Sequence, residues 1–93
     1  MDIYQFKSTL TGFEPPREWN VQLQALWYDA KGDWTTAHGL IDDLTDLGSA
    51  HVHAYLHRVE GDLWNARYWY QRAGEVEFIG SLSAEREALI LKF

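Results

Sequence analysis

The chain of 93 residues contains no cysteine. This absence excludes disulfide bonds, thiolate metal ligands and a cysteine nucleophile. Disulfides belong mainly to proteins of oxidising compartments, so a chain without cysteine fits the reducing cytoplasm. We therefore expect a cytoplasmic protein that is held together by its core alone.

Basic residues are also scarce. Lysine and arginine number 8 against 14 aspartate and glutamate residues, which gives a formal net charge of −6. Nucleic acids and anionic membranes are bound through clusters of lysine and arginine, so neither is expected as a partner. No apolar stretch approaches the length of a membrane span, and the N-terminal residues lack the basic start and apolar core of a signal peptide.

Proline occurs only at Pro15 and Pro16, and no segment alternates between apolar and polar residues for long enough to predict a strand. Apolar residues recur instead at helical spacing, as they do at Leu23, Leu26 and Trp27. Hydrophobic residues make up 46% of the chain, which is enough for one buried core. The sequence therefore predicts a single all-α domain over residues 1–93.

Glycines followed by capping residues set the expected helix ends. Glycine commonly follows the last residue of a helix, and a Ser or Asp side chain can accept hydrogen bonds from the free amides that open the next one. The expected ends are Gly32, Gly48, Gly61 and Gly74, and the expected caps are Asp33, Ser49, Asp62 and Ser83. We predict an N-terminal segment over 1–15, a first helical hairpin over 16–47, a second over 49–74 and a capping helix over 83–93.

The two hairpins look like copies of one another. Four positions match at a constant offset of 29, namely Ala25 with Ala54, Gly32 with Gly61, Asp33 with Asp62, and Ala37 with Ala66. Each match has a mechanical reason, because small alanines let helices approach, glycine turns the chain, and aspartate caps the following helix. The pattern therefore predicts two equivalent helix–turn–helix units.

These motifs resemble the tetratricopeptide repeat and its Sel1-like relatives, although the offset of 29 is shorter than the ~34 residues of the standard repeat. The chain also resembles a small family of bacterial proteins without an assigned activity. The resemblance implies a scaffold whose ligands lie along the first helices of successive hairpins. That inner face would comprise Trp19, Gln22, Leu26, Asp29, His51, Tyr55 and Arg58. The alternative is a groove that is too short to bind a ligand or that is filled by the chain's own N-terminus.

The histidines permit two interpretations. His53, His57 and Glu60 project from one side of a helix, and His38 and Asp42 lie four residues apart on the preceding one. Together these five residues could hold a divalent metal, which makes a metal-binding or metal-dependent hydrolytic protein the alternative function. The repeat alignment instead places His53 and His57 in the seam between helices, where they serve packing. Since no second metal motif is present, we predict no metal and no cofactor.

Aromatic residues and the C-terminal helix suggest self-association. Trp64 and Tyr68 lie outside the apolar stripe of their helix, and the last helix carries apolar residues on more than one side. The final helix or the loop around Phe78 and Ile79 is the first expected cover for Trp64 and Tyr68, and a monomer in which residues 75–82 and the N-terminal helix fold over these surfaces is the alternative to a dimer. Exposed apolar surface at the end of a repeat array needs a cover. We expect a homodimer whose interface draws on Trp64, Tyr68, Leu89, Ile90 and Phe93.

Motifs of catalysis are missing. There is no phosphate-binding glycine loop and no nucleophilic serine elbow, and the tetratricopeptide resemblance transfers no catalytic residues. The sequence therefore predicts a protein-interaction or oligomerisation module, not an enzyme, with a second copy of itself as the expected partner.

Overall fold

Six α-helices and no strands make up the computed structural model, which describes all 93 residues. The helices are α1 (Ile3–Ser8), α2 (Val21–Ala30), α3 (Trp34–Ile41), α4 (Leu47–Val59), α5 (Leu63–Ala73) and α6 (Leu82–Lys92). The prediction of an all-α fold is confirmed. None of the six helices combines the length and the apolar character that a bilayer span requires.

The two hairpins turn in the same way. Gly32 and Gly61 adopt φ values of +83° and +82°, in the left-handed region that glycine enters without a steric penalty. After each glycine an aspartate amide donates to a carbonyl five residues back, Asp33 to Tyr28 and Asp62 to His57, both at 2.9 Å. The predicted turn residues therefore form two equivalent turns.

Alanines occupy the close helix contacts, as the repeat pattern predicts. Ala25, Ala37 and Ala54 are completely buried and Ala66 is almost so. The packing of α2 against α3 and of α4 against α5 is the most extensive in the molecule, and α3 packs on α4 to join the hairpins. Small side chains at these positions let the helix backbones approach one another.

Two predicted boundaries of the first hairpin are wrong. The helix expected from Pro16 starts at Val21, because Asn20 caps it by accepting from the Leu23 amide at 2.8 Å. The next helix ends at Ile41 and not at Leu47. Three aspartates over residues 42–46 explain the second correction, since acidic side chains are unfavourable at the negative end of a helix.

Asp46 begins the second hairpin in place of Ser49, which was the expected cap. Its carboxylate accepts from the Ser49 amide at 3.0 Å, so Gly48 lies inside α4 and does not end the preceding helix. A Cβ atom at Gly48 would stand only 2.8 Å from the Phe93 ring. Gly48 therefore serves the close approach of the C-terminus to α4. The cap of the last helix likewise lies two residues earlier than expected, at Ser81 and not at Ser83.

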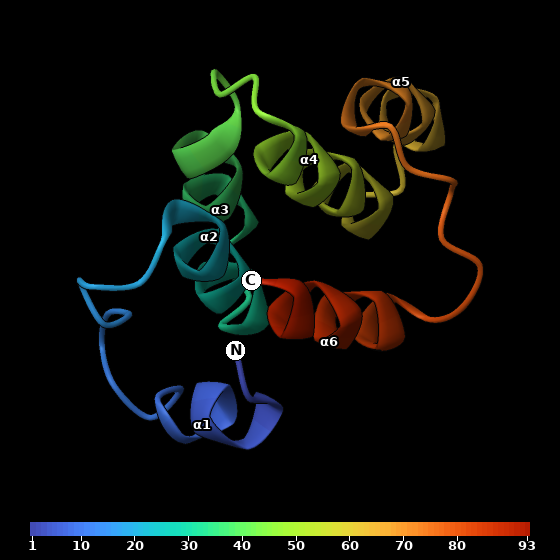
Figure 1. Cartoon of the computed structure of the whole chain (residues 1–93). Helices are drawn as coiled ribbons and strands as arrows, with labels where there is room; N and C mark the ends of the chain where they lie inside the picture. Colours follow the sequence, from blue (N-terminus) through green and yellow to red (C-terminus); the bar gives the residue numbers. More distant parts are fainter.

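Helix α6 does not extend the stack of hairpins. Figure 1 shows it turning back beyond α5 to run toward α2 and α1, and it packs on α4, α1 and α2. Leu89 and Ile90 of α6 join the main core, in which they meet residues of all three of these helices. The predicted capping helix is therefore present, but it fills the inner side of the array.

Candidate functional site

The predicted inner face is closed by α6. Leu26, Asp29 and Tyr55 are buried, so the expectation that they line an accessible binding surface is wrong. Tyr55 Oη donates to Asp29 Oδ2 at 2.5 Å, and Arg86 of α6 lies 3.3 Å from the same oxygen. Burial, and then the charge of Asp29, raise the pKa of the Tyr55 hydroxyl. These groups bind one another and hold α6 in place.

A second buried network ties α6 to the second hairpin. Glu85 is only 1% exposed and accepts from Arg58 Nη1 at 2.6 Å and from Tyr70 Oη at 2.5 Å. Arg58, another predicted inner-face residue, also donates to the Gly80 carbonyl at 2.8 Å. The sequence prediction missed Glu85, although it lies four residues before Leu89 on the buried side of α6.

The other inner-face residues lie at the rim of the array. The ring of Trp19 stacks on Phe6 at a centroid distance of 5.5 Å. Gln22 donates to Ser49 Oγ at 3.0 Å, and His51 contacts Lys92 at 2.9 Å. The seven predicted residues are therefore internal contacts and rim positions, and they do not form an open groove.

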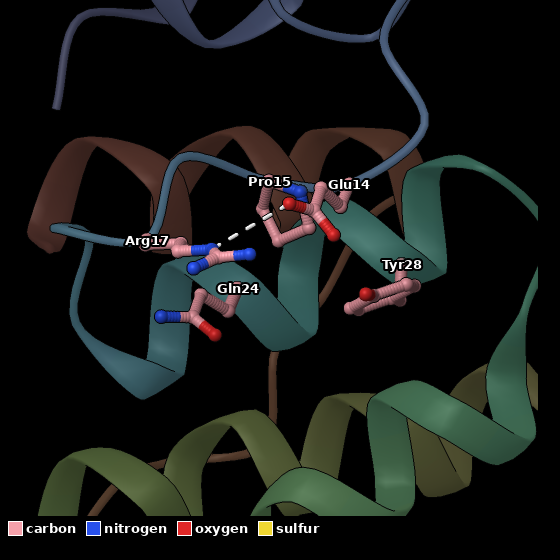
Figure 2. Close-up of a pocket in the computed structure, with 5 residues that line it drawn as sticks. All are labelled: Glu14, Pro15, Arg17, Gln24 and Tyr28. Atoms are coloured by element: carbon pink, nitrogen blue, oxygen red, sulfur yellow. Dashed lines mark ion pairs between the residues drawn. The ribbon is translucent and has the colours of Figure 1, made fainter.

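A shallow depression lies between α2 and the loop that precedes it (Figure 2). Gln24 and Tyr28 of α2 face Glu14, Pro15 and Arg17 of the loop. The single ion pair there joins Arg17 Nε to Glu14 Oε1 at 3.6 Å, and both side chains are largely exposed. Exposed pairs of this kind contribute little, and the depression brings no reactive groups together.

The histidine cluster is assembled from two helices. His38 lies on α3, and His53 and His57 lie one turn apart on α4. The Nε2 atoms of His38 and His53 are 3.0 Å apart. One ring nitrogen from each of the three histidines lies within 4.8 Å of the other two. The structure therefore brings together the three histidines that the sequence singled out.

The two predicted carboxylates lie behind the rings. Glu60 Oε1 is 2.6 Å from His57 Nδ1, and Asp42 Oδ2 is 3.9 Å from His38 Nδ1. Each carboxylate thus faces the Nδ1 atom of its histidine. Glu60 forms a second group of possible ligands with His57 and Asp62, within 4.8 Å of one another, whereas the expected ligand Asp42 belongs to neither group.

Two tryptophans wall the cluster, and the sequence prediction did not find them. Trp34 stacks on His38 at 4.6 Å and Trp69 stacks on His53 at 3.9 Å between ring centroids. Burial, and then the neighbouring rings of His38 and His57, lower the pKa of His53 to about 4. Burial also lowers the pKa of His38. Both rings are therefore neutral at neutral pH.

The predicted dimer contacts fall into two groups. Leu89 and Ile90 are buried in the core of their own chain, so their assignment to a dimer interface is wrong, and Phe93 is partly buried against α4. Trp64 and Tyr68 on α5 are 75% and 44% exposed. The apolar side of α6 packs in the core against α4, α1 and α2, so α6 does not cover the outer side of α5.

Comparisons with protein families, with curated proteins and with solved structures find no match for this chain.

Proposed function

We propose that the chain is a protein-interaction module that self-associates through the outer face of α5. This face comprises Leu63, Trp64, Tyr68 and Arg72, all of which are exposed. The observation that carries the proposal is the 75% exposure of Trp64 on a helix whose extensive packing is with α4 alone. Tryptophan, tyrosine and arginine are the residue types enriched at the energetic centres of protein interfaces.

The position of α5 in the array explains why this face is free. In stacked helical hairpins, each hairpin covers the one before it, and the terminal hairpin needs a polar cap. Here α6 fills the inner side, where it meets α4 and α2, and leaves α5 as the terminal surface (Figure 1). A partner that covers the outer face of α5 would replace the missing cap.

The order of residues on this face suits a second copy of the chain. Trp64, Tyr68 and Arg72 lie four residues apart, so they form one line along the helix. A two-fold axis at Tyr68 would set Trp64 of each copy beside Arg72 of the other. An arginine over a tryptophan ring is attractive, and Arg72 already lies 5.8 Å from the Tyr68 ring centroid. Two-fold dimers are also the commonest oligomers.

The proposal also covers the repeat family to which the chain is related and the compartment in which it works. The matching glycine turns and buried alanines support a two-hairpin variant of the tetratricopeptide or Sel1-like repeat. The buried acids Asp29 and Glu85 are both bound by neighbouring side chains, which supports a structural and not a catalytic role. The lack of cysteine supports a cytoplasmic location.

Sedimentation velocity over a range of concentrations tests the proposal. We expect a dimer for the unchanged chain at micromolar concentration and a monomer for Trp64→Glu and for Arg72→Glu. Phe13→Glu is the matched control, because Phe13 is fully exposed in the loop before α2 and should leave the dimer intact. A monomeric unchanged chain, or a dimer that Trp64→Glu does not weaken, would refute the proposal.

A further inference from the structure

We propose that the histidine cluster is a binding site for a divalent transition-metal ion of the zinc type. The ligands of this ion are His38, His53 and His57. Imidazole nitrogens favour ions such as zinc over magnesium and calcium, which prefer oxygen ligands. Three histidines with a fourth position left open form a common zinc coordination set.

The spacing of the nitrogens fits one ion. Zinc–nitrogen bonds of about 2.0–2.1 Å in a tetrahedron place two ligand nitrogens about 3.3 Å apart. The Nε2 atoms of His38 and His53 are 3.0 Å apart, and a nitrogen of His57 lies within 4.8 Å of both. Small rotations of these side chains would bring all three nitrogens to the required separation.

The carboxylates supply the outer support that metal-bound histidines usually have. Glu60 lies 2.6 Å from His57 Nδ1, so it holds the proton on that atom and leaves the Nε2 lone pair free. Asp42 faces His38 Nδ1 in the same sense at 3.9 Å. An oxygen of Asp62 also lies within 4.8 Å of a nitrogen of His57. These three carboxylates would supply negative charge around a bound dication.

Packing alone explains the cluster less well. His53 Nδ1 is buried and has no hydrogen-bond partner, so the contact of Nε2 with His38 is the one polar contact of this ring. The contact between the Nε2 atoms of His38 and His53 holds only one proton, with one nitrogen as the donor and the lone pair of the other as the acceptor. A metal ion would accept the lone pairs of both atoms.

The cluster is also accessible from one side. The side chain of His38 is 23% exposed, and those of Asp42 and Glu60 lie further out. An ion can therefore enter between α3 and the end of α4, and a water molecule can take the fourth position. The aromatic rings of Trp34 and Trp69 close the other sides and limit the movement of His38 and His53.

Calorimetric titration of the chelator-treated full chain with ZnCl₂ tests the site. We expect one zinc ion per chain and the loss of this binding in His38→Gln and in His53→Gln. His51→Gln is the matched control, because His51 is the one histidine outside the cluster and lies on α4, as His53 does. Circular dichroism establishes that each variant is folded.

Two further measurements test the site even if the His38→Gln or the His53→Gln variant fails to fold. Glu60→Gln should weaken zinc binding roughly 10–100-fold while the stoichiometry stays at one, because it removes only the outer support of His57. Co²⁺ bound to the unchanged chain should show the intense visible absorption of a tetrahedral site. No zinc binding by the unchanged chain, or binding that survives in both His38→Gln and His53→Gln, would overturn the proposal.

Discussion

Replacement of Glu85 by alanine should be among the most damaging single changes in this protein. Glu85 is almost completely buried where α6 meets the second hairpin, and it accepts from Arg58 at 2.6 Å and from Tyr70 at 2.5 Å. Glu85→Ala leaves a guanidinium and a hydroxyl without their acceptor in a dry environment. The variant therefore measures how firmly α6 is held in the array.

The expected magnitude follows from the surroundings of the two donors. Removal of one partner of a buried ion pair costs about 3–5 kcal/mol. Arg58 is 17% exposed and keeps its bond to the Gly80 carbonyl, so part of its charge can be hydrated and the cost falls to about 2–3 kcal/mol. The unpaired Tyr70 hydroxyl adds about 1 kcal/mol. The sum, about 3–4 kcal/mol, is a large share of the roughly 5–14 kcal/mol expected for a domain of this length.

Urea unfolding followed by circular dichroism measures this cost as a shift of the midpoint at constant slope. Glu87→Ala is the matched control on the same helix, because Glu87 forms only a solvent-exposed pair with Lys7 at 3.3 Å, and we expect a change within about 0.5 kcal/mol. A Glu85→Ala variant as stable as the Glu87→Ala control would refute the role of Glu85 in docking α6 on the second hairpin.

The remaining predictions address the repeat, its turns and its caps, and urea unfolding measures each of them. Ala54→Leu overpacks the seam between α4 and α5 and should cost about 1–3 kcal/mol, and an unchanged stability would contradict the repeat alignment. Gly61→Ala should destabilise by about 1–2 kcal/mol because of its φ of +82°, whereas Gly39→Ala, inside α3 with free space around it, should stabilise by about 0.5–1 kcal/mol. Hydrogen bonds from the Ser49 side chain and amide lower the pKa of Asp46 below 3.8, so this cap stabilises the fold at neutral pH and is lost as pH falls through the folded-state pKa. Asp46→Asn should therefore flatten the dependence of stability on pH below about pH 4, and an unaltered dependence would contradict this account.

The two hairpin turns and their caps Asp33 and Asp62 could be predicted from the sequence because they depend on neighbouring residues. The glycine and aspartate of each hairpin turn act over five residues, and both turns form as expected. The start of α2 was misplaced because Pro16 and Asn20 are both suitable helix starts. Only the structure shows that Asn20 caps the helix while residues 16–19 form a turn, in which the Trp19 amide donates to the Pro16 carbonyl at 3.2 Å.

The placement of α6 could not be predicted from the sequence. An amphipathic helix at the end of an array can cover either the outer helix or the inner face, and its apolar residues fit both. The choice depends on Glu85 meeting Arg58, a pair separated by 27 residues in the chain. The histidine cluster shows the same limit, since spacing places His53 beside His57, but the contact with His38 depends on the packing of α3 against α4.

Cross-linking through a single introduced cysteine tests most directly the claim that the outer face of α5 is the interaction surface. Because the chain has no cysteine of its own, one introduced cysteine is the only thiol. Gln71→Cys places it on α5 beside Tyr68, and Thr35→Cys places it on an exposed position of α3 as the control. With a short thiol-specific cross-linker at equal protein concentration, we expect a covalent dimer from Gln71→Cys and a monomer from Thr35→Cys. Equal yields of covalent dimer from the two variants would contradict it.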